Sequence, residues 1–215
     1  VASDFLSVHR LVQAVARDRL SDEERKRWAE AAVRLVNDAF PFESQDVRTW
    51  PKCSVLLPHA LAAAGHSEGL EVAPEPAGRL LNQAGLYLKG RAEFDEAKSA
   101  YERALEIDEK VYGPDHPEVA TMVNNLGGVL RALGDLAGAK KSYERALEIA
   151  DKAYGSDHPT VAIRVNNLGG ILYAMGDLEG ARENLERALE IFQHFLGGDH
   201  PKTKLVRKNL ESLRR

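Results

Sequence analysis

The chain has 215 residues, of which 44% are hydrophobic, and its formal net charge at pH 7 is −4. This length and apolar content suffice for one long domain or two small ones. Charges of both signs are interspersed, which argues against a nucleic-acid-binding or membrane-binding chain. A single cysteine, Cys53, excludes an internal disulfide framework and fits a reducing compartment, so we expect a cytoplasmic location.

Residues 1–77 are expected to form a helical N-terminal segment that does not share the repetition seen later in the chain. Residues 5–19 predict a short extended piece leading into an amphipathic helix. Ser21 and Glu24 have the spacing of a capping box, which starts a second helix that ends near Phe40. The apolar stripe of this second helix is predicted to be Trp28, Ala32, Leu35, Val36 and Ala39.

The end of this segment contains helix-breaking residues. Residues 46–64 predict a third helix or a broken helix, interrupted near Pro51 and Pro58 because proline lacks the N–H donor that a helix interior needs. Residues 65–76 are rich in Gly, Pro and Glu and predict a linker or a corner into the rest of the chain.

The remainder of the chain repeats with a period of 42 residues. The sequence Asn-Asn-Leu-Gly-Gly occurs at 124–128 and 166–170, and Asp-His-Pro begins at 115, 157 and 199. A fixed period in this range predicts a solenoid, whose stacked units form an extended surface suited to binding. The predicted units span residues 78–114, 115–156 and 157–198, and a capping helix follows at 199–215.

Two helices are predicted in each unit. In the second unit, the first helix is expected to run from about Asp115, its N-cap, to Leu133, with Pro117 in the first turn. The second helix is expected over residues 136–154, because Gly155 is suited to end it.

The spacing of small and large residues in this unit resembles the tetratricopeptide repeat. The residues that carry the resemblance are Leu126, Gly127, Leu130, Gly134, Ala139, Tyr143 and Ala146, and the same offsets hold in the next unit. The longer period and the Asp-His-Pro corner are similar to the kinesin-light-chain type of this repeat. Over residues 78–213 the resemblance implies an all-α fold, a right-handed superhelical solenoid of helical hairpins, on which the helical N-terminal segment packs.

No metal, cofactor or catalytic site is predicted in this chain. His116, His158 and His200 occupy one corner of successive units. Stacked helical layers lie roughly 10 Å apart, whereas metal–ligand bonds are about 2 Å long, so we assign these histidines to helix capping. Phosphate-loop and hydrolase motifs are also absent from the sequence.

The positions beside the buried stripe of each first helix are predicted to line the concave groove of the solenoid. Asn125 and Asn167 match a residue of the repeat consensus and are assigned to the fold. The predicted partner-binding residues are Arg79, Asn82 and Lys89 in the first unit, Thr121, Asn124, Gly128 and Arg131 in the second, and Ile163, Asn166, Gly170 and Tyr173 in the third.

Two groups of these residues have alternative interpretations. Asn82, Asn124 and Asn166 would form a ladder of amides that can bond the backbone of an extended peptide, or they are a polar lining exposed to water. Gly128 and Gly170 each cost about 1 kcal/mol in a helix interior relative to alanine. Either a ligand backbone approaches these glycines, or neighbouring repeats are in tight contact there.

Near the start of the chain, Val8-His9-Arg10 resembles the Met-His-Asp motif that ends the winged-helix domain of NB-ARC proteins, members of the STAND class of signal-transduction NTPases. In that family the histidine reaches the β-phosphate of bound ADP. The resemblance implies that His9 contacts the nucleotide in a parent protein, and that residues 1–77 comprise the end of a winged-helix-like region and connector helices. Val8 and Arg10 depart from the motif, so only His9 is carried over.

We therefore expect a protein-protein or peptide recognition module, the sensor and regulatory repeat region of a larger bacterial STAND NTPase. The alternative is an independent scaffold or adaptor of the kinesin-light-chain-like type. The expected partner is a protein or peptide ligand in the groove, not a nucleic acid or a membrane. Oligomerisation would occur through the parent NTPase.

Overall fold

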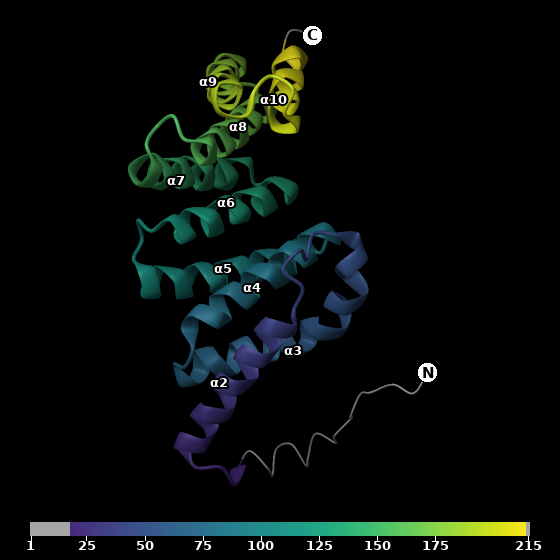
Figure 1. Ribbon diagram of the computed structural model, residues 1–215, viewed down its shortest axis with the longest axis vertical. Coiled ribbons are helices and arrows are strands. Elements are labelled where there is room, and N and C mark those ends of the chain that lie inside the picture. Colours follow the sequence, from purple (N-terminus) through teal and green to yellow (C-terminus); the bar gives the residue numbers. More distant parts are fainter. Residues whose placement is uncertain (1–17, 214–215) are drawn as a thin grey trace.

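The computed structural model describes residues 18–213, which form nine α-helices and one 3₁₀ helix, η1 at Val47–Thr49 (Figure 1). No helix within this range is long and apolar enough to cross a membrane. The α-helices are α2 (Asp22–Ala39), α3 (Trp50–Leu70), α4 (Pro74–Gly90), α5 (Phe94–Tyr112), α6 (Pro117–Ala132), α7 (Leu136–Tyr154), α8 (Pro159–Ala174), α9 (Leu178–Leu196) and α10 (Pro201–Ser212).

From α4 onward, consecutive helices pair as hairpins that stack along the long axis of the molecule (Figure 1). α4 packs on α5, α6 on α7 and α8 on α9, and the second helix of each pair also packs on the helix that follows it. Only three residues separate the two helices of a hairpin, which forces them to be antiparallel neighbours. The predicted all-α solenoid of helical hairpins is confirmed.

Glycine and aspartate shape the turn inside the second and third hairpins. Gly134 and Gly176 have a φ of +85°, a backbone angle that residues other than glycine rarely adopt. The Asp135 and Asp177 side chains then cap α7 and α9, accepting hydrogen bonds of 2.8 and 2.9 Å from backbone N–H groups three residues on. These two residue types therefore end one helix and begin the next.

Histidine caps the corner between hairpins. The N-cap of α6 is His116, whose Nδ1 accepts a hydrogen bond of 3.2 Å from the N–H of Glu118. The prediction that Asp115 caps this helix is wrong, because the extended backbone of His116 already places an acceptor over the first turn. His158 and His200 cap α8 and α10 in the same way, which confirms the structural role predicted for the three histidines.

A glycine of each first helix lies directly against a large side chain of its second helix. A Cβ on any of these glycines would come closer to the facing side chain than real Cβ atoms do. The close packing predicted for Gly127 and Gly169 is thus confirmed. The pairs, with the shortest distance from such a Cβ, are Gly85 with Tyr101 (2.7 Å), Gly127 with Tyr143 (2.9 Å) and Gly169 with Leu185 (2.9 Å).

The helix after the predicted capping box begins as expected but turns a different face to the core. Ser21 and Glu24 form the complete box at the start of α2. The buried residues are Ala29 and Val33, whereas Trp28, from the predicted stripe, is 57% exposed. Leu35, also predicted to be buried, is 71% exposed. The predicted spacing was right, but the buried register lies about one residue further along the helix.

The predicted interruptions and linker before the repeats are also wrong. Pro51 lies in the first turn of α3, where no N–H is needed, and Pro58 lies inside the helix without ending it. α3 continues to Leu70, so much of the predicted 65–76 linker is helical. Residues 71–73 alone connect α3 to α4, which starts before the predicted first unit.

The N-terminal helices extend the stack by another layer. Val33, Cys53 and Ala60 share one buried cluster with residues of α4, α5 and α6. An ion pair also joins these layers, since Arg103 of α5 lies 2.7 Å from Glu68 of α3. The later arginines at 145 and 187 make the same kind of bond to the preceding layer. The N-terminal segment therefore continues the packing of the repeats without sharing their sequence.

Overpacking a hairpin crossing should destabilise the protein. Ala139 is fully buried between the helices of the second hairpin, so Ala139→Leu should lower the free energy of unfolding by about 1–3 kcal/mol. Ala137 lies on the same helix and is exposed, so Ala137→Leu is the matched control. Chemical denaturation of both variants checks this, and equal midpoints would contradict the assigned crossing.

Candidate functional site

The first helices of the hairpins, α4, α6 and α8, together with α10, form one surface, called here the first-helix face. Two pockets, of about 310 and 260 Å³, lie on it. The first pocket includes the predicted residues Arg79 and Asn82. The second brings four predicted groove residues together with their neighbours and is lined by Arg131, Asn166, Asn167, Gly170, Tyr173, Leu185, Asn209 and Ser212.

The asparagines of this face form a ladder between successive first helices. Asn125 donates through Nδ2 to Asn82 Oδ1 at 3.1 Å, and Asn167 donates to Asn124 at 2.8 Å. The same bond joins α10 to α8, from Asn209 to the residue at 166, at 3.1 Å. The side-chain oxygens of Asn82, Asn124 and Asn166 are thus each used as acceptors by the fold. Their side-chain N–H groups donate to no other described residue. Those donors remain available at the surface.

Long basic side chains lie over the two unexplained glycines. A Cβ on Gly128 would lie 2.7 Å from the Nζ of Lys89, which belongs to the preceding first helix. A Cβ on Gly170 would lie 3.5 Å from the Nη1 of Arg131, again one repeat earlier. The space over Gly128 is therefore occupied by the protein itself. This geometry favours the alternative of contact between neighbouring repeats over the approach of a ligand backbone.

The cations held over these glycines lack counter-charges. Neither Lys89 nor Arg131 forms an ion pair within the described residues, and burial together with the positive charge of Arg131 lowers the pKa of the Lys89 ammonium. The arginines of the second helices differ, since Arg145 and Arg187 reach carboxylates of the preceding layer. Positive charge is therefore left unpaired on the first-helix face.

Two predicted groove residues instead serve the fold. Thr121 Oγ1 donates to the carbonyl of Pro117 at 3.3 Å and accepts from Arg164 Nη2 at 3.2 Å. Ile163 is half-buried and packs against the core of the third hairpin. Both side chains make contacts within the stack, and their role in binding a partner stays a prediction.

Two buried charged residues, Asp108 and Arg164, were not predicted from the sequence. Asp108 is 6% exposed and lines the larger of the two first-helix pockets, beside Glu118. Arg164 is 7% exposed and donates a single hydrogen bond, to Thr121. The signal was present in the repeat alignment, because Asp108 stands 42 residues before Ala150 and Arg164 stands 42 residues after Met122.

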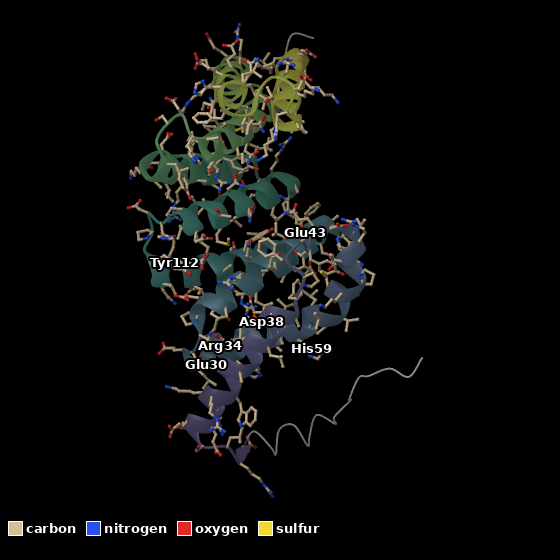
Figure 2. The ribbon with its side chains drawn as sticks, viewed as in Figure 1. Glu30, Arg34, Asp38, Glu43, His59 and Tyr112 are labelled. Carbon is tan, nitrogen blue, oxygen red and sulfur yellow. The ribbon has the colours of Figure 1, made fainter. Side chains whose placement is uncertain are left out.

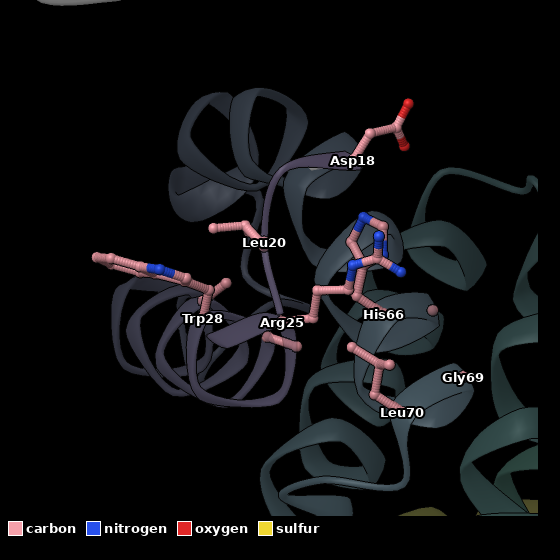
Figure 3. A pocket seen from close by; sticks show the side chains of 10 residues that line it. Asp18, Leu20, Arg25, Trp28, His66, Gly69 and Leu70 are labelled. Atoms are coloured by element: carbon pink, nitrogen blue, oxygen red, sulfur yellow. The ribbon is translucent and has the colours of Figure 1, made fainter. Parts of the chain in front are cut away.

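A further pocket, of about 580 Å³, lies between α2 and α3 (Figure 3). Trp28 and Leu20 line one side of it, and His66 and Leu70 line the other. It lies next to Asp18, at the start of the described residues, whereas the predicted His9 lies outside them. Within residues 18–213, no group of three His, Cys, Asp or Glu side chains is arranged to hold a metal ion.

The repeats are those of a known family. A family model described as the tetratricopeptide repeat matches residues 77–137, 118–164 and 162–215. The chain belongs to the tetratricopeptide repeat family. Repeats of this family form protein-interaction modules.

Two solved structures have this fold over most of their length. BtubC (BKLC) from P. vanneervenii has a TM-score of 0.67 and 23% identity, with 96% of this chain and 84% of BtubC covered. A kinesin-light-chain protein of nearly identical TPR-like repeats from Podosopora anserina has a TM-score of 0.64 and 16% identity, with 91% of this chain and 87% of the other covered.

Sequence comparison adds a relative of a different kind. A protein of Hyaloscypha variabilis described as a nucleotide-binding leucine-rich repeat (NLR)-like protein is 31% identical over 118 residues. The match covers 54% of this chain and 12% of the relative. The chain thus corresponds to a small part of that much longer protein.

Adjacent glycines of α8 should respond in opposite ways to the same substitution. Gly169→Ala should destabilise the protein, because its Cβ would lie 2.9 Å from Leu185 Cγ and 3.2 Å from the backbone oxygen of Ala181. Gly170→Ala should stabilise it by up to about 1 kcal/mol, because the Cβ meets only Arg131 at an ordinary contact distance. Thermal melting of the two variants checks this, and stabilisation by Gly169→Ala would contradict the packing described.

Asp108 should make stability depend on pH. Burial, with the nearby charge of Glu118, raises the pKa of Asp108 from its ordinary value near 3.8 to about 6. The native state therefore holds the proton more tightly than the unfolded chain, and stability falls as the pH rises from about 4 to about 6. Asp108→Asn should remove this loss, on the order of 1–3 kcal/mol above pH 6, and change little at pH 4.

Denaturation across this pH range measures the difference between Asp108→Asn and the parent chain. Asp115→Asn, at a side chain that is 71% exposed, is the control. A gain for Asp108→Asn that is the same at every pH would contradict the assignment.

Proposed function

We propose that this chain recognises an extended, acidic segment of a protein partner along its first-helix face. The observation that carries the proposal is the unpaired positive charge of Lys89 and Arg131, set beside amide groups with free N–H donors. Asp and Glu side chains of a peptide would supply the missing counter-charges. The amides of Asn82, Asn124 and Asn166 would bond backbone carbonyls of the peptide.

The stack also suits an elongated ligand. The asparagine bonds fix one first helix relative to the next, so the free groups recur at nearly constant intervals along the face. A rigid array of this kind is preorganised, which reduces the entropy lost on binding. Tyr173 is 48% exposed at the position equivalent to Lys89 and Arg131, and it offers an aromatic surface at one end of the array.

We further propose that the chain is the sensor and regulatory repeat region of a STAND NTPase. This part of the proposal is supported by the NLR-like relative from Hyaloscypha variabilis and by the Met-His-Asp resemblance around His9. Sequencing the complete coding region tests it directly. A phosphate-loop NTPase domain preceding the repeats is expected, whereas a coiled coil in that place would favour an independent adaptor.

The groove proposal predicts which cations matter for binding. Peptides selected from a randomised library on the parent chain should be acidic. Arg131→Ala should then weaken their binding roughly ten-fold or more, because a lost hydrogen bond to a charged group costs about 1.5–3 kcal/mol. Lys141 is exposed on the second helix of the same hairpin, so Lys141→Ala is the matched control.

Calorimetric titration of the selected peptides into both variants measures the effect. The first-helix face is the wrong surface if Lys141→Ala weakens binding and Arg131→Ala does not.

A further inference from the structure

We infer that the pocket between α4, α5 and α6 is a binding site for the guanidinium group of an arginine on a protein partner. The pocket has a volume of about 310 Å³. It lies at the N-terminal ends of α4 and α6, and therefore at the opposite helix ends from Lys89 and Arg131. Figure 2 places Tyr112, one of its lining residues, at the end of α5 next to the corner that leads to α6.

A buried carboxylate without a partner lies in this pocket. Asp108 is 6% exposed, and its Oδ1 lies 2.7 Å from the position that a Cβ on Gly78 would occupy. Glycine at 78 thus makes room for this carboxylate. Among residues 18–213, no hydrogen bond and no ion pair reaches the Asp108 oxygens. These oxygens are not fully enclosed, so a cation that enters the pocket can reach them and supply the pairing that a buried carboxylate normally has.

The next repeat interface shows what fills the equivalent space. Thr121, Tyr154 and Arg164 stand 42 residues after Arg79, Tyr112 and Met122, respectively. There, the guanidinium of Arg164 is buried, donates 3.2 Å to Thr121 and lies near Tyr154. The fold itself therefore places a guanidinium in this position one repeat further along, where the residue equivalent to Asp108 is Ala150.

At the third equivalent interface, between α8, α9 and α10, apolar side chains fill the corresponding space. Phe192 takes the place of Asp108 and is 2% exposed, and Val206 takes the place of Met122 and is 1% exposed. The two equivalent positions are thus Asp108 and Met122 in the first interface, Ala150 and Arg164 in the second, and Phe192 and Val206 in the third. Only the first combines a carboxylate with a pocket of this size.

The charges around the pocket favour a cation. Glu75 and Glu118 join Asp108 at the lining, against the single guanidinium of Arg79, which is exposed and forms no ion pair within the described residues. A planar guanidinium donates several hydrogen bonds at once to carboxylates and stacks on aromatic rings. The ring of Tyr112 is already stacked on that of His116, another lining residue, at 4.7 Å, so only its other face is left for such a contact. A lysine ammonium would match the charge but not the planar shape.

The assignment to a protein partner rests on the proposed function, because the pocket opens on the same first-helix face. The guanidinium chemistry itself does not depend on it. The two can be separated, since Arg131→Ala should leave this pocket unchanged and Asp108→Asn should leave acidic-peptide contacts at Lys89 and Arg131 unchanged. Loss of one binding event without the other therefore identifies which proposal fails.

The probe is N-acetyl-arginine amide, compared by NMR titration with its neutral analogue N-acetyl-citrulline amide. The arginine probe should shift the backbone resonances of Gly78 and Glu118 in a saturable way. The citrulline probe and the Asp108→Asn variant should each bind at least ten-fold more weakly, because the charge-assisted bond is lost. Equal binding of the two probes, unaltered binding to Asp108→Asn, or no saturable shift would overturn the inference.

A second variant fills the pocket from within. Met122→Arg places a guanidinium at the position equivalent to Arg164, with Asp108 as its counter-charge because Arg79 stands in the place of Thr121, and should abolish probe binding while the protein still melts near the parent temperature. In the Asp108→Asn background the same arginine should lower the melting temperature markedly, since its counter-charge is gone. Met175 is exposed, so Met175→Arg is the matched control and should leave binding intact.

Equal melting temperatures of Met122→Arg in the two backgrounds would show that no guanidinium–Asp108 pair forms. Free arginine distinguishes the source of the ligand, since a peptide main chain is mimicked only by the amide-blocked probe. Clearly tighter binding of free arginine would overturn the assignment to a protein segment and point to a small metabolite.

Discussion

The close approach of two helices at a glycine sets the geometry on which the rest of the molecule depends. In the second hairpin, Gly127 leaves the space that Tyr143 fills, and its counterparts at 85 and 169 do the same for a tyrosine and a leucine. Any side chain at these glycines would separate the helices, and every later repeat would then be displaced. Because the same contact recurs, the hairpins are nearly alike and stack with a constant offset. The free groups of the first-helix face inherit that regular spacing.

Contacts between successive first helices decide which of their polar groups are used by the fold and which remain available at the surface. Each asparagine bond, such as Asn167 to Asn124, uses one acceptor and leaves amide donors free. Gly128 leaves room for Lys89 along the next helix, whereas Arg131 lies at an ordinary contact distance from Gly170, and no acid of the described residues pairs with either cation. The cost of Gly128 in its helix is thus explained by the placement of Lys89, while no close contact requires glycine at 170. Stability and recognition share the same short stretch of each repeat, which is why single positions there can alter either.

The period and turn residues predict α7 to the residue, at 136–154, together with the hairpin crossings, although the corner before α6 is capped by His116 and not by Asp115. The N-terminal helices lack a second copy for comparison, so the sequence misplaces the stripe on α2 and predicts an interruption at Pro58 that α3 does not have. Side-chain direction was also beyond the sequence, because the course of Lys89 over Gly128 depends on the offset between repeats. Asp108 escaped notice because an acid on an amphipathic helix is ordinarily solvated.

Because the repeats are similar to one another, a buried charge that occurs in only one of them is informative. Repeats that begin as copies present the same interface several times, and a hydrophobic substitution at one copy needs only a packing change. A charge is different, since burying Asp108 or Arg164 without an opposite charge costs free energy that apolar residues of similar size would not. Both nevertheless stand at equivalent interfaces, one repeat apart, and neither is paired within the described residues. Arg164 at least donates a hydrogen bond to Thr121, whereas no hydrogen bond within the described residues reaches Asp108. The carboxylate is therefore the charged residue of these interfaces whose burial the contacts of the fold explain least.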